Sequence, residues 1–291
     1  MQSKRSKRVV AIHDLSGYGR ISLTVAIPVL NTMGFNVCPL PTAILSSGTQ
    51  FSKFTFLDLT EEMKKIIAAW KELHLEFDAF YSGYLGSPEQ IDIVKDFIAD
   101  FKKEDNLVVV DPVLGDNGKL YTGFDYQIVM KMRELIKVAD VITPNLTELS
   151  FLLDCPYQEE YHDDELKKIM LELSGQGPQI VIITSVPVLG DPNHTSVYAY
   201  NRSGNRFWKA TCPYLPAHYP GMGDTFASVI TGALMQGDSL PLALDRATQF
   251  CYQGIRATFG HDYEKREGVL LEKVLGNLNA PIQVTSYEMI N

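Results

Sequence analysis

The stretch YPGMGDTFAS, residues 219–228, places two glycines and one acid directly before an apolar run of small residues. The run 226–235 is typical of a helix, so Gly221 and Gly223 would lie at the helix start. Glycine lets the backbone approach a ligand closely, and the free N–H groups at a helix start, the positive end of its dipole, suit a phosphate. The stretch therefore predicts an anion-binding helix N-terminus.

Asp224 admits two interpretations. A carboxylate in the first turn can simply cap its helix, which is the usual explanation for an isolated G-x-G-D. An anion site with a base beside it could instead hold a transferring phosphoryl group and deprotonate the attacking hydroxyl. Because the chain supplies further polar groups, we interpret Asp224 as a general base and the backbone of Gly221, Met222 and Gly223 as an anion hole.

Length, composition and charge limit the classes of protein to consider. With 291 residues, 45% hydrophobic and 21% charged, the chain has the composition of a folded soluble protein with a large core. The net charge of −9 argues against a general role at nucleic acids or membrane surfaces, and no apolar run is long enough to cross a bilayer. The basic residues 4–8 precede an apolar stretch too short for a signal peptide, so residues 1–8 are expected to form a solvated tail.

The cysteine pattern indicates a reducing compartment. The four cysteines are widely spaced, with no C-x-x-C pair and no adjacent histidine, which disfavours a disulfide framework or a structural zinc site. We therefore expect reduced thiols and a cytoplasmic protein. The residues are Cys38, Cys155, Cys212 and Cys251.

Most of the chain alternates short apolar strands with segments of helical periodicity, which indicates a doubly wound α/β fold. The valine-rich run 107–110 is typical of a central parallel strand, and the alternating segments 196–200 and 206–211 predict a β-hairpin at the sheet edge. We expect one domain over residues 1–291, an open and mostly parallel sheet with helices on both faces, and a C-terminal tail, 281–291, without an assigned element. The other expected strands are 9–12, 35–40, 77–81, 140–142 and 180–184, and the expected helices are 21–33, 63–73 with a cap at Thr60, 89–102, 127–138, 146–153, 165–173, 226–235, 240–259 and 269–275.

Polar residues follow several of these strands at their carboxyl ends, the edge that forms the ligand crevice of an open parallel sheet. Asp111 and Asp116 follow the strand 107–110, and Glu148 follows the next strand along the chain. Taken singly, Asp111 is explained as a turn residue before proline and Glu148 as a first-turn helix acid. Together they supply the oxygen ligands and negative charge that Mg²⁺ prefers beside a transferring phosphate.

Two common nucleotide-binding motifs do not occur in the sequence. The GYG of residues 17–19 lacks the third glycine of the dinucleotide fingerprint, since Ser22 stands there, and the next strand carries no acid for a ribose. No Walker A sequence is present either, so a nucleotide would be held by another loop. The incomplete dinucleotide fingerprint argues against a nicotinamide oxidoreductase.

With these residues in place, the chain resembles the ribokinase superfamily and, within it, the pyridoxal kinase branch. The resemblance covers residues 9–268, and the loop SSGTQF, residues 46–51, points with Ser-Gly-Tyr to the vitamin B6 branch. It implies a ribokinase-like fold and ATP-dependent phosphorylation of the 5′-hydroxyl of pyridoxal, pyridoxamine or pyridoxine. The motifs are GMGD at 221–224, DPVLGD at 111–116, TPN at 143–145 with Glu148, TS at 184–185 and SGYLGS at 82–87.

The resemblance also assigns roles by position. Asp224 would activate the 5′-hydroxyl, and Gly221, Met222 and Gly223 would receive the γ-phosphate. Matches to positions that handle Mg²⁺ or the phosphates are Asp116, Tyr121 and Glu148; matches to contacts with the nucleotide or its phosphates are Asp111, Asn145, Thr184 and Ser185; and matches to residues around the pyridine ring are Thr49 and Tyr84, with Tyr84 stacking on the ring.

Two departures from the family pattern concern the substrate pocket. Asp14, with Ser16 two residues on, stands where the family usually has a serine that contacts the ring. An acid there could pair with a protonated ring nitrogen or an amine, which would favour pyridoxamine. Ser47 and Gly48 replace the Asn-His that commonly precedes Thr49.

The resemblance carries expectations about partners as well. Family members look like homodimers, use ATP with Mg²⁺, and are often assisted by a monovalent cation such as K⁺. A loop before the anion hole, here residues 214–219, would fold over ATP.

Two other functions stay open. A hydroxymethylpyrimidine kinase of the same superfamily often has Cys in place of the acid of G-x-G-D, so Asp224 argues against it. A nucleotide-binding regulator could keep the fold without turnover, but all the proposed catalytic carboxylates are present in this chain.

Overall fold

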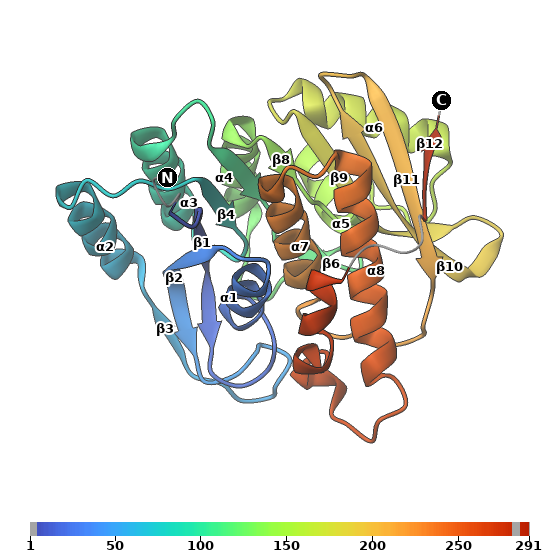
Figure 1. Ribbon diagram of the computed structural model, residues 1–291, viewed down its shortest axis with the longest axis horizontal. Coiled ribbons are helices and arrows are strands. Elements are labelled where there is room, and N and C mark those ends of the chain that lie inside the picture. The colour runs from blue at the N-terminus through green and yellow to red at the C-terminus, as the bar shows by residue number, and fades with distance from the viewer. Residues whose placement is uncertain (1–4, 281–285, 291) are drawn as a thin grey trace.

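The main sheet has ten strands in the order β12-β11-β10-β9-β8-β5-β4-β1-β2-β3, as the ribbon in Figure 1 shows. The computed structural model describes residues 5–280 and 286–290. Pairings from β2 across to β9 are parallel, whereas β3 and the strands from β9 to β12 pair antiparallel. The expected fold class, an open and mostly parallel α/β sheet, is confirmed. The strands are β1 (Arg8–Ser16), β2 (Asn36–Leu45), β3 (Phe56–Asp58), β4 (Ala79–Ser82), β5 (Leu107–Val110), β8 (Val141–Ile142), β9 (Ile180–Val188), β10 (Asp191–Asn201), β11 (Arg206–Pro213) and β12 (Tyr287–Ile290).

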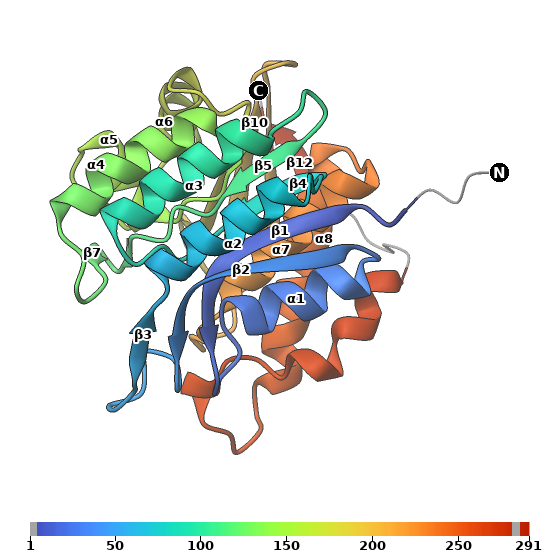
Figure 2. The same cartoon turned by 90° about the vertical axis from the view of Figure 1, so that its left-hand side faces the viewer.

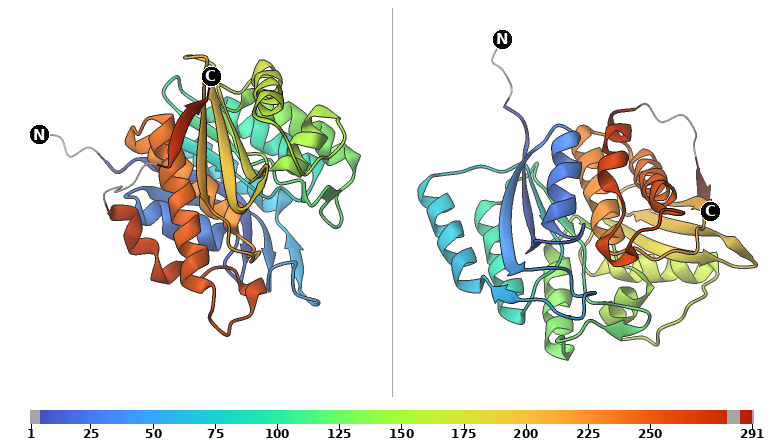
Figure 3. Two further views of the ribbon diagram at one scale, coloured as in Figure 1. Left: turned by 90° about the vertical axis from the view of Figure 1, so that its right-hand side faces the viewer. Right: turned by 90° about the horizontal axis from the view of Figure 1, so that it is seen from below.

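Helices cover both faces of this sheet, because successive residues of a strand point to opposite faces. On β1, Val9 and Ala11 enter the core under α1, α7 and α8, whereas Val10 and Ile12 enter the core under α2 to α6. Figure 2 shows α1 and α2 on opposite sides of β1 and β2, and Figure 3 shows α8 running along the antiparallel strands. The helices are α1 (Leu23–Thr32), α2 (Thr60–Glu72), α3 (Pro88–Phe101), α4 (Tyr126–Leu135), α5 (Leu146–Leu153), α6 (Asp163–Gly175), α7 (Met222–Gln236) and α8 (Leu240–Thr258), with short 3₁₀ turns η1 (Ile136–Val138), η2 (Lys265–Glu267), η3 (Leu271–Lys273) and η4 (Leu275–Asn279).

Strand β2 runs past two prolines to Leu45, beyond the expected end at residue 40. Pro39 and Pro41 pair in register with β1, and within the described residues β3 reaches β2 only at Ala43–Leu45. The side of β2 away from β1 is therefore an open edge at both prolines. Proline is tolerated there because it removes no ladder hydrogen bond.

One helix start was predicted to within one residue, and the cap of another was not predicted correctly. Ser87 caps α3 by accepting a hydrogen bond from the N–H of Gln90 at 3.2 Å, and Pro88 opens the helix. The expected cap at Thr60 is wrong, because Thr60 is already helical. The Asp58 carboxylate accepts its N–H instead, at 2.8 Å.

The last third of the chain departs most from expectation. The predicted hairpin forms from β10 and β11, but it is not the sheet edge, because β12 pairs with β11 outside it. Residues 287–290 of the expected C-terminal tail are thus a strand, while 281–285 and 291 lie outside the described residues. The helix expected over 269–275 is wrong: the segment forms two 3₁₀ turns, and Gly276 lies inside the second.

The N-terminal segment is attached to the surface at Asp78 and, through Lys7, at the Met235 carbonyl. Residues 1–4 of the expected tail lie outside the described residues. Arg5 donates a hydrogen bond to the Asp78 carboxylate at 2.8 Å, and the N–H of Arg8 donates to the same carboxylate at 2.7 Å. The expected solvated tail over 1–8 therefore ends in a tethered segment that leads directly into β1.

Candidate active site

The helix α7 starts at Met222, inside the GMGD stretch and four residues before the predicted apolar run. Its N-cap, Gly221, has φ of 78°, in the left-handed region, and a Cβ there would lie 2.1 Å from the carbonyl oxygen of Arg20. Only glycine fits this position. An α-helix leaves its first N–H groups without partners inside the helix, and here they belong to Met222, Gly223 and Asp224.

Asp224 does not cap its own helix. Its Oδ2 accepts a hydrogen bond from the backbone N–H of Ser22 at 2.8 Å, across 202 positions of sequence. The side chain keeps 14% of its surface exposed, and its backbone carbonyl accepts from the Tyr81 hydroxyl at 3.3 Å. The carboxylate is therefore held at the mouth of the helix start, between α7 and the segment that follows β1.

Ser22 links two acids, and the sequence reasoning missed it as a site residue. Its N–H binds Asp224, while its hydroxyl donates to Asp14 Oδ1 at 2.5 Å. The residue has φ of 52° and ψ of −126°, a rare backbone conformation for a side chain with a Cβ. A rare conformation held beside an acid pair is a sign of function that only the structure could reveal.

Asp14 and Ser16 lie together beneath Asp224. Both side chains are buried, and the Ser16 hydroxyl donates to Asp14 Oδ2 at 3.1 Å. Burial raises the pKa of Asp14, the charge of Asp224 raises it further, and the Ser22 hydroxyl opposes the rise. The two predicted substrate residues are thus brought together next to the predicted base.

Asp111 lies on the other flank of Asp224. The Thr143 hydroxyl donates to its Oδ1 at 2.9 Å, and a Cβ at Gly223 would lie 3.7 Å from its Oδ2. Burial raises the pKa of Asp111, and the Asp224 charge adds to the rise. Gly223 therefore leaves room between this acid and the helix start.

Glu148 and Asn145 form the capping box of α5. Glu148 accepts from the N–H of Asn145 at 2.8 Å and from the N–H of Leu114 at 3.2 Å. The Asn145 amide caps Thr147 and Glu148 and donates to the Gly115 carbonyl at 3.0 Å. Burial, then the Asp111 charge, raises the pKa of Glu148 well above its usual range. Glu148 is therefore a first-turn acid of its helix, as expected from its position, and it also lies near Asp111.

Asp116 stands on a hairpin that the sequence reasoning described only as a rigid turn. Strands β6 (Gly115–Asp116) and β7 (Lys119–Leu120) are joined by Asn117 and Gly118, with φ of 51° and 74°, as a type I′ turn requires. Asp116 Oδ2 lies 4.0 Å from Nε2 of His218, which belongs to the expected ATP loop. The hairpin thus presents the acid toward that loop.

Tyr121 follows the hairpin and lies among the acids. Burial raises its pKa, and the charges of Glu148, Asp116 and Asp111 raise it further. A hydroxyl that is hard to ionise remains a hydrogen-bond donor at all ordinary pH values. This suits a contact with phosphate oxygens.

Tyr84 already has an aromatic partner, which the sequence did not predict. Its ring stacks on Phe124 with centroids 5.6 Å apart and planes 18° apart. Phe124 is presented by a turn in which its N–H donates to the carbonyl of Tyr121 at 3.0 Å and Gly123 has φ of 91°. Burial raises the pKa of Tyr84 to about 12, with Asp14 as the next cause. One face of Tyr84 is therefore taken by Phe124, and a ligand would use the other.

The remaining predicted residues are less tightly placed. Thr49 is exposed, in a loop attached where the N–H of Gly48 donates to the Tyr18 carbonyl at 3.2 Å. Thr184 was expected to end its strand, but β9 continues to Val188. Ser185 has φ of 58° at the point where the β9–β10 register shifts, which is a β-bulge. Bulges next to active sites re-aim side chains.

The acids do not form a ready-made metal cage. Within residues 5–280 and 286–290, no group of three His, Cys, Asp or Glu side chains converges as a metal site. Mg²⁺ usually keeps several waters and takes only one or two carboxylates plus substrate phosphates. The oxygen-rich flank formed by Asp111, Asp116 and Glu148 fits that pattern of binding.

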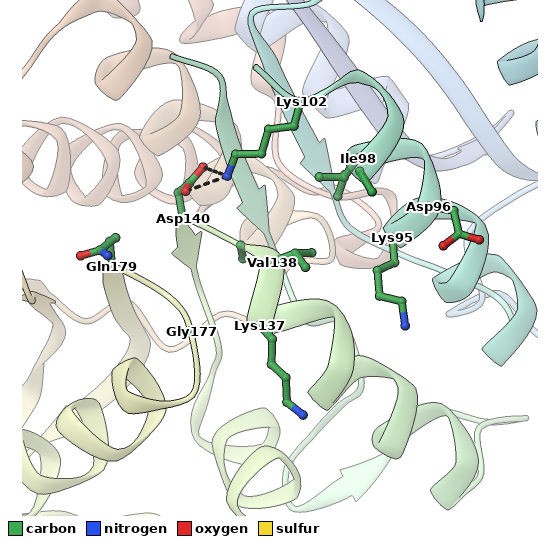
Figure 4. A pocket seen from close by; sticks show the side chains of 11 residues that line it. Lys95, Asp96, Ile98, Lys102, Lys137, Val138, Asp140, Gly177 and Gln179 are labelled. Atoms are coloured by element: carbon green, nitrogen blue, oxygen red, sulfur yellow. Dashed lines mark hydrogen bonds and ion pairs between the residues drawn. The ribbon is translucent and has the colours of Figure 1, made fainter. Parts of the chain in front are cut away.

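A separate hollow of about 490 Å³ lies at the amino-end edge of the sheet, away from these residues (Figure 4). Its lysines are already paired with acids: Lys102 with Asp140 at 3.0 Å, Lys95 with Asp92 at 3.7 Å, and Lys137 with Glu134 at 2.6 Å. The lysine charges in this hollow are therefore used within the protein.

The chain matches one protein family and is similar to proteins of known structure. The sequence matches the phosphomethylpyrimidine kinase family over residues 27–268. Among solved structures, the chain is similar to a Bacteroides thetaiotaomicron protein, described as a candidate phosphomethylpyrimidine kinase and crystallised with pyridoxal. The two are 68% identical with a TM-score of 0.96, over 98% of this chain and all of that one.

Two pyridoxal kinases are also similar to the chain. The structure of the Lactobacillus plantarum enzyme is 35% identical with a TM-score of 0.86, over 94% of this chain and 97% of that one. The curated pyridoxal kinase of Dictyostelium discoideum is 28% identical over 264 residues, 86% of each chain. Of the helices that the structure describes, none is both long and apolar enough to cross a membrane.

Proposed function

The chain belongs to the phosphomethylpyrimidine kinase family, and from that membership and the site we propose that it transfers the γ-phosphoryl group of ATP to the 5′-hydroxyl of vitamin B6. The acceptors would be pyridoxal, pyridoxamine and pyridoxine. The similarity to pyridoxal kinases and to a protein crystallised with pyridoxal supports the vitamer as acceptor. The observation that carries the proposal is the Asp224 carboxylate, held at the mouth of the α7 N-terminus by Ser22.

Asp224 is the proposed general base. Its Oδ2 is oriented by the Ser22 N–H, which leaves lone pairs of the carboxylate for an alcohol at the helix mouth. The base takes the proton as the alcohol oxygen attacks the γ-phosphorus, and the bond from that phosphorus to the β-bridging oxygen of ATP breaks. A positioned base typically contributes about a hundred- to ten-thousandfold to the rate.

The backbone of Gly221, Met222 and Gly223 is the proposed anion hole. The first N–H groups of α7 and its dipole face the same mouth as Asp224, so they can stabilise charge on the transferring phosphoryl group. Because Gly221 packs on the Arg20 carbonyl, these donors are fixed before ligand arrives.

We propose that Asp111, Asp116 and Glu148 hold Mg²⁺, in part through water, and that Tyr121 contacts the phosphates. When bound, Mg²⁺ neutralises phosphate charge. The acids suit this role because burial, and then a neighbouring carboxylate, raises the pKa of Asp111 and of Glu148. A bound cation would offset that repulsion. Nucleotide contacts from Asn145, Thr184 and Ser185 stay a proposal from position, and Asn145 would contribute whatever its capping role leaves free. A requirement for K⁺ is proposed from the family resemblance and is tested by exchanging K⁺ for tetramethylammonium.

On the other flank we propose that Asp14, Ser16, Thr49 and Tyr84 surround the pyridine ring. The free face of Tyr84 can stack on a flat aromatic ring, and Asp14 can accept a hydrogen bond from a ring nitrogen or an amine. The raised pKa of Asp14 fits an acid that shares a proton with its ligand.

The test is an ADP-release assay with ATP and Mg²⁺ across the three vitamers and 4-amino-5-hydroxymethyl-2-methylpyrimidine. We expect turnover of the vitamers, with the 5′-phosphate as product by mass spectrometry. The family match favours the pyrimidine alcohol as a second candidate substrate. Turnover of that alcohol alone would show that the vitamer assignment is wrong.

Assembly and location are further proposals. Leu15, Ile44 and Leu57 are cross-strand neighbours on β1, β2 and β3, and all three are exposed. This apolar row supports a homodimer, because large apolar rows on a surface usually mark an interface. We propose a cytoplasmic location because the reaction consumes ATP and all four cysteines are free thiols. Size-exclusion chromatography with light scattering tests the dimer.

A further inference from the structure

His13 is a buried histidine that the proposed reaction leaves unused. It lies on β1, its side chain is fully buried, and within the described residues neither ring nitrogen has a hydrogen-bond partner. Its Nδ1 lies 3.7 Å from Oδ1 of Asp224, the carboxylate oxygen that Ser22 does not hold. That distance is too long for a hydrogen bond. A buried polar ring without a partner, facing the proposed base, requires an explanation.

The ring has no freedom to turn elsewhere. The Tyr81 ring packs against it edge to face, with centroids 4.4 Å apart. A Cβ at Gly83 would lie 2.3 Å from Nδ1, so the backbone at Gly83 also closes against the imidazole. The Nδ1 edge of His13 is therefore fixed toward Asp224 by β4 and by the turn that follows it.

The ionisable groups around His13 are two carboxyl groups and one tyrosine hydroxyl. Asp14 is the next residue on β1, Asp224 faces the ring from α7, and Tyr81 comes from β4. Asp111, directly after β5, interacts with Asp224. A ring held among carboxylates is best used as an N–H donor, because an acceptor nitrogen facing a carboxylate would be repelled.

Resting on the proposed function, we propose that His13 is a positioning residue for Asp224. When ATP and the alcohol are bound, Nδ1–H closes to a hydrogen bond with Oδ1, as catalytic hydrogen bonds often tighten in the reactive complex. The base is then held at both oxygens, by the Ser22 N–H and by His13. The alcohol proton moves to a remaining lone pair of the same carboxylate, and His13 neither gains nor loses a proton.

Three substitutions separate this role from packing. The amide nitrogen of His13→Asn takes the place of Nδ1, that of His13→Gln takes the place of Nε2, and His13→Leu has no donor. We expect His13→Asn to keep kcat within about threefold, while His13→Gln and His13→Leu lose tenfold or more, because a misplaced catalytic group can cost up to about a hundredfold. KM for ATP and for pyridoxal should stay within twofold in all three.

A second readout is the acidic limb of kcat against pH. Removing a donor makes Asp224 easier to protonate, so this limb should shift to higher pH in His13→Gln and His13→Leu and stay in place in His13→Asn. Thr248→Val is the matched control, because Thr248 Oγ1 on α8 is also buried and without a hydrogen-bond partner among the described residues. It should change neither kcat nor the limb.

The outcomes keep the two proposals apart. No turnover of any vitamer by the wild-type protein would remove the proposed function, and this inference with it. Vitamer turnover that depends on Asp224 but is unchanged in His13→Leu would leave the function standing and overturn the inference. Equal losses in His13→Asn and His13→Gln would show that the ring acts by packing, which also overturns it. If His13→Leu does not fold, the comparison of Asn with Gln decides.

Discussion

The carboxylates on the two flanks of Asp224 receive hydrogen bonds from different kinds of donor. On the β1 flank, Asp14 receives two hydroxyl hydrogen bonds, from Ser16 and Ser22. On the β5 flank, Asp111 receives a single hydroxyl, from Thr143, and Glu148 is held by backbone N–H groups only. On the β1 flank, the hydroxyls that donate to Asp14 can also form hydrogen bonds with a polar ligand. The β5 flank gathers negative charge that side chains leave unneutralised.

Under the proposed function, this difference matches the ligand that each flank would bind. Hydroxyls with an aromatic face suit a small polar ring, and Tyr84 supplies that face beside Asp14. A carboxyl group such as Glu148, whose pKa is raised by burial and then by the Asp111 charge, suits a divalent cation, whose charge reverses the local repulsion. Asp224 stands where the two flanks meet, so under the proposed function the alcohol would arrive from one flank and the phosphate from the other.

The largest effect should come from removing the group between the flanks. Asp224→Ala should lower kcat by about two to four orders of magnitude, because the reaction loses its positioned base. KM for ATP should change little. Steady-state kinetics by ADP release measures both, and near-normal kcat in a folded Asp224→Ala protein would refute the assignment of the base.

Tyr84→Ala should affect the β1 flank alone. Loss of the stacking face should raise KM for pyridoxal by about tenfold, since an aromatic pair contributes roughly 0.5–1.5 kcal/mol beyond burial. KM for ATP should stay within twofold. The opposite pattern, a raised KM for ATP with pyridoxal unaffected, would move Tyr84 out of the ring pocket.

On the β5 flank, the raised pKa of Asp111 should make the stability of the folded protein depend on pH. The pKa of Asp111 rises on folding from its ordinary 3.8 to about 7, so the folded state binds this proton more tightly. Its contribution to stability is therefore complete below about pH 4 and is lost as the pH rises to about 7.

Asp111→Asn removes this penalty. Without Mg²⁺, we expect it to raise the midpoint of thermal unfolding by roughly 5 °C at pH 8 and to have little effect at pH 4.5. Asp14→Asn is the comparison on the β1 flank. It should gain less at pH 8, because its two hydroxyl donors favour the charged form. Equal gains for both variants would contradict the contrast between the flanks.

The smallest effect should come from the ring behind Tyr84. Phe124→Leu removes the stacked partner but keeps an apolar side chain, so Tyr84 should become less well oriented. We expect KM for pyridoxal to rise about threefold, with kcat and KM for ATP unchanged. Phe54→Leu is a matched control on an exposed aromatic residue. A rise of the same size in both variants would mean that Phe124 has no special relation to Tyr84.

Much of this arrangement follows from local patterns in the sequence. Strand β5 and helix α5 have the predicted bounds, because a valine-rich run and an Asn-x-x-Glu start are local signals that tertiary contacts do not override. Asp111, Asp116 and Glu148 could be grouped in advance, since the carboxyl ends of parallel strands share one edge of the sheet.

The residues that sequence reasoning missed depend on contacts between distant segments. Ser22 became a site residue only when its N–H was seen to reach Asp224, 202 positions away. His13 reads as a polar residue of the loop after the expected strand 9–12, but β1 continues through it, and its burial against Tyr81 and Gly83 is set by β4 and the turn after it. The contact of Phe124 with Tyr84 could not be predicted, because the sequence does not show where the turn after β7 places the Phe124 ring. No local periodicity encodes such contacts.

The packing at Gly221 has a consequence for synthesis of the chain. The Arg20 carbonyl lies against Gly221, and the Arg20 N–H donates to the Glu267 carbonyl at 2.9 Å, so the loop after β1 is sandwiched by segments made some two hundred residues later. On the ribosome, the first strands emerge long before those segments. The polypeptide must therefore be almost fully translated before any catalytic centre can exist, and truncated products ending ahead of residue 267 are expected to be inert.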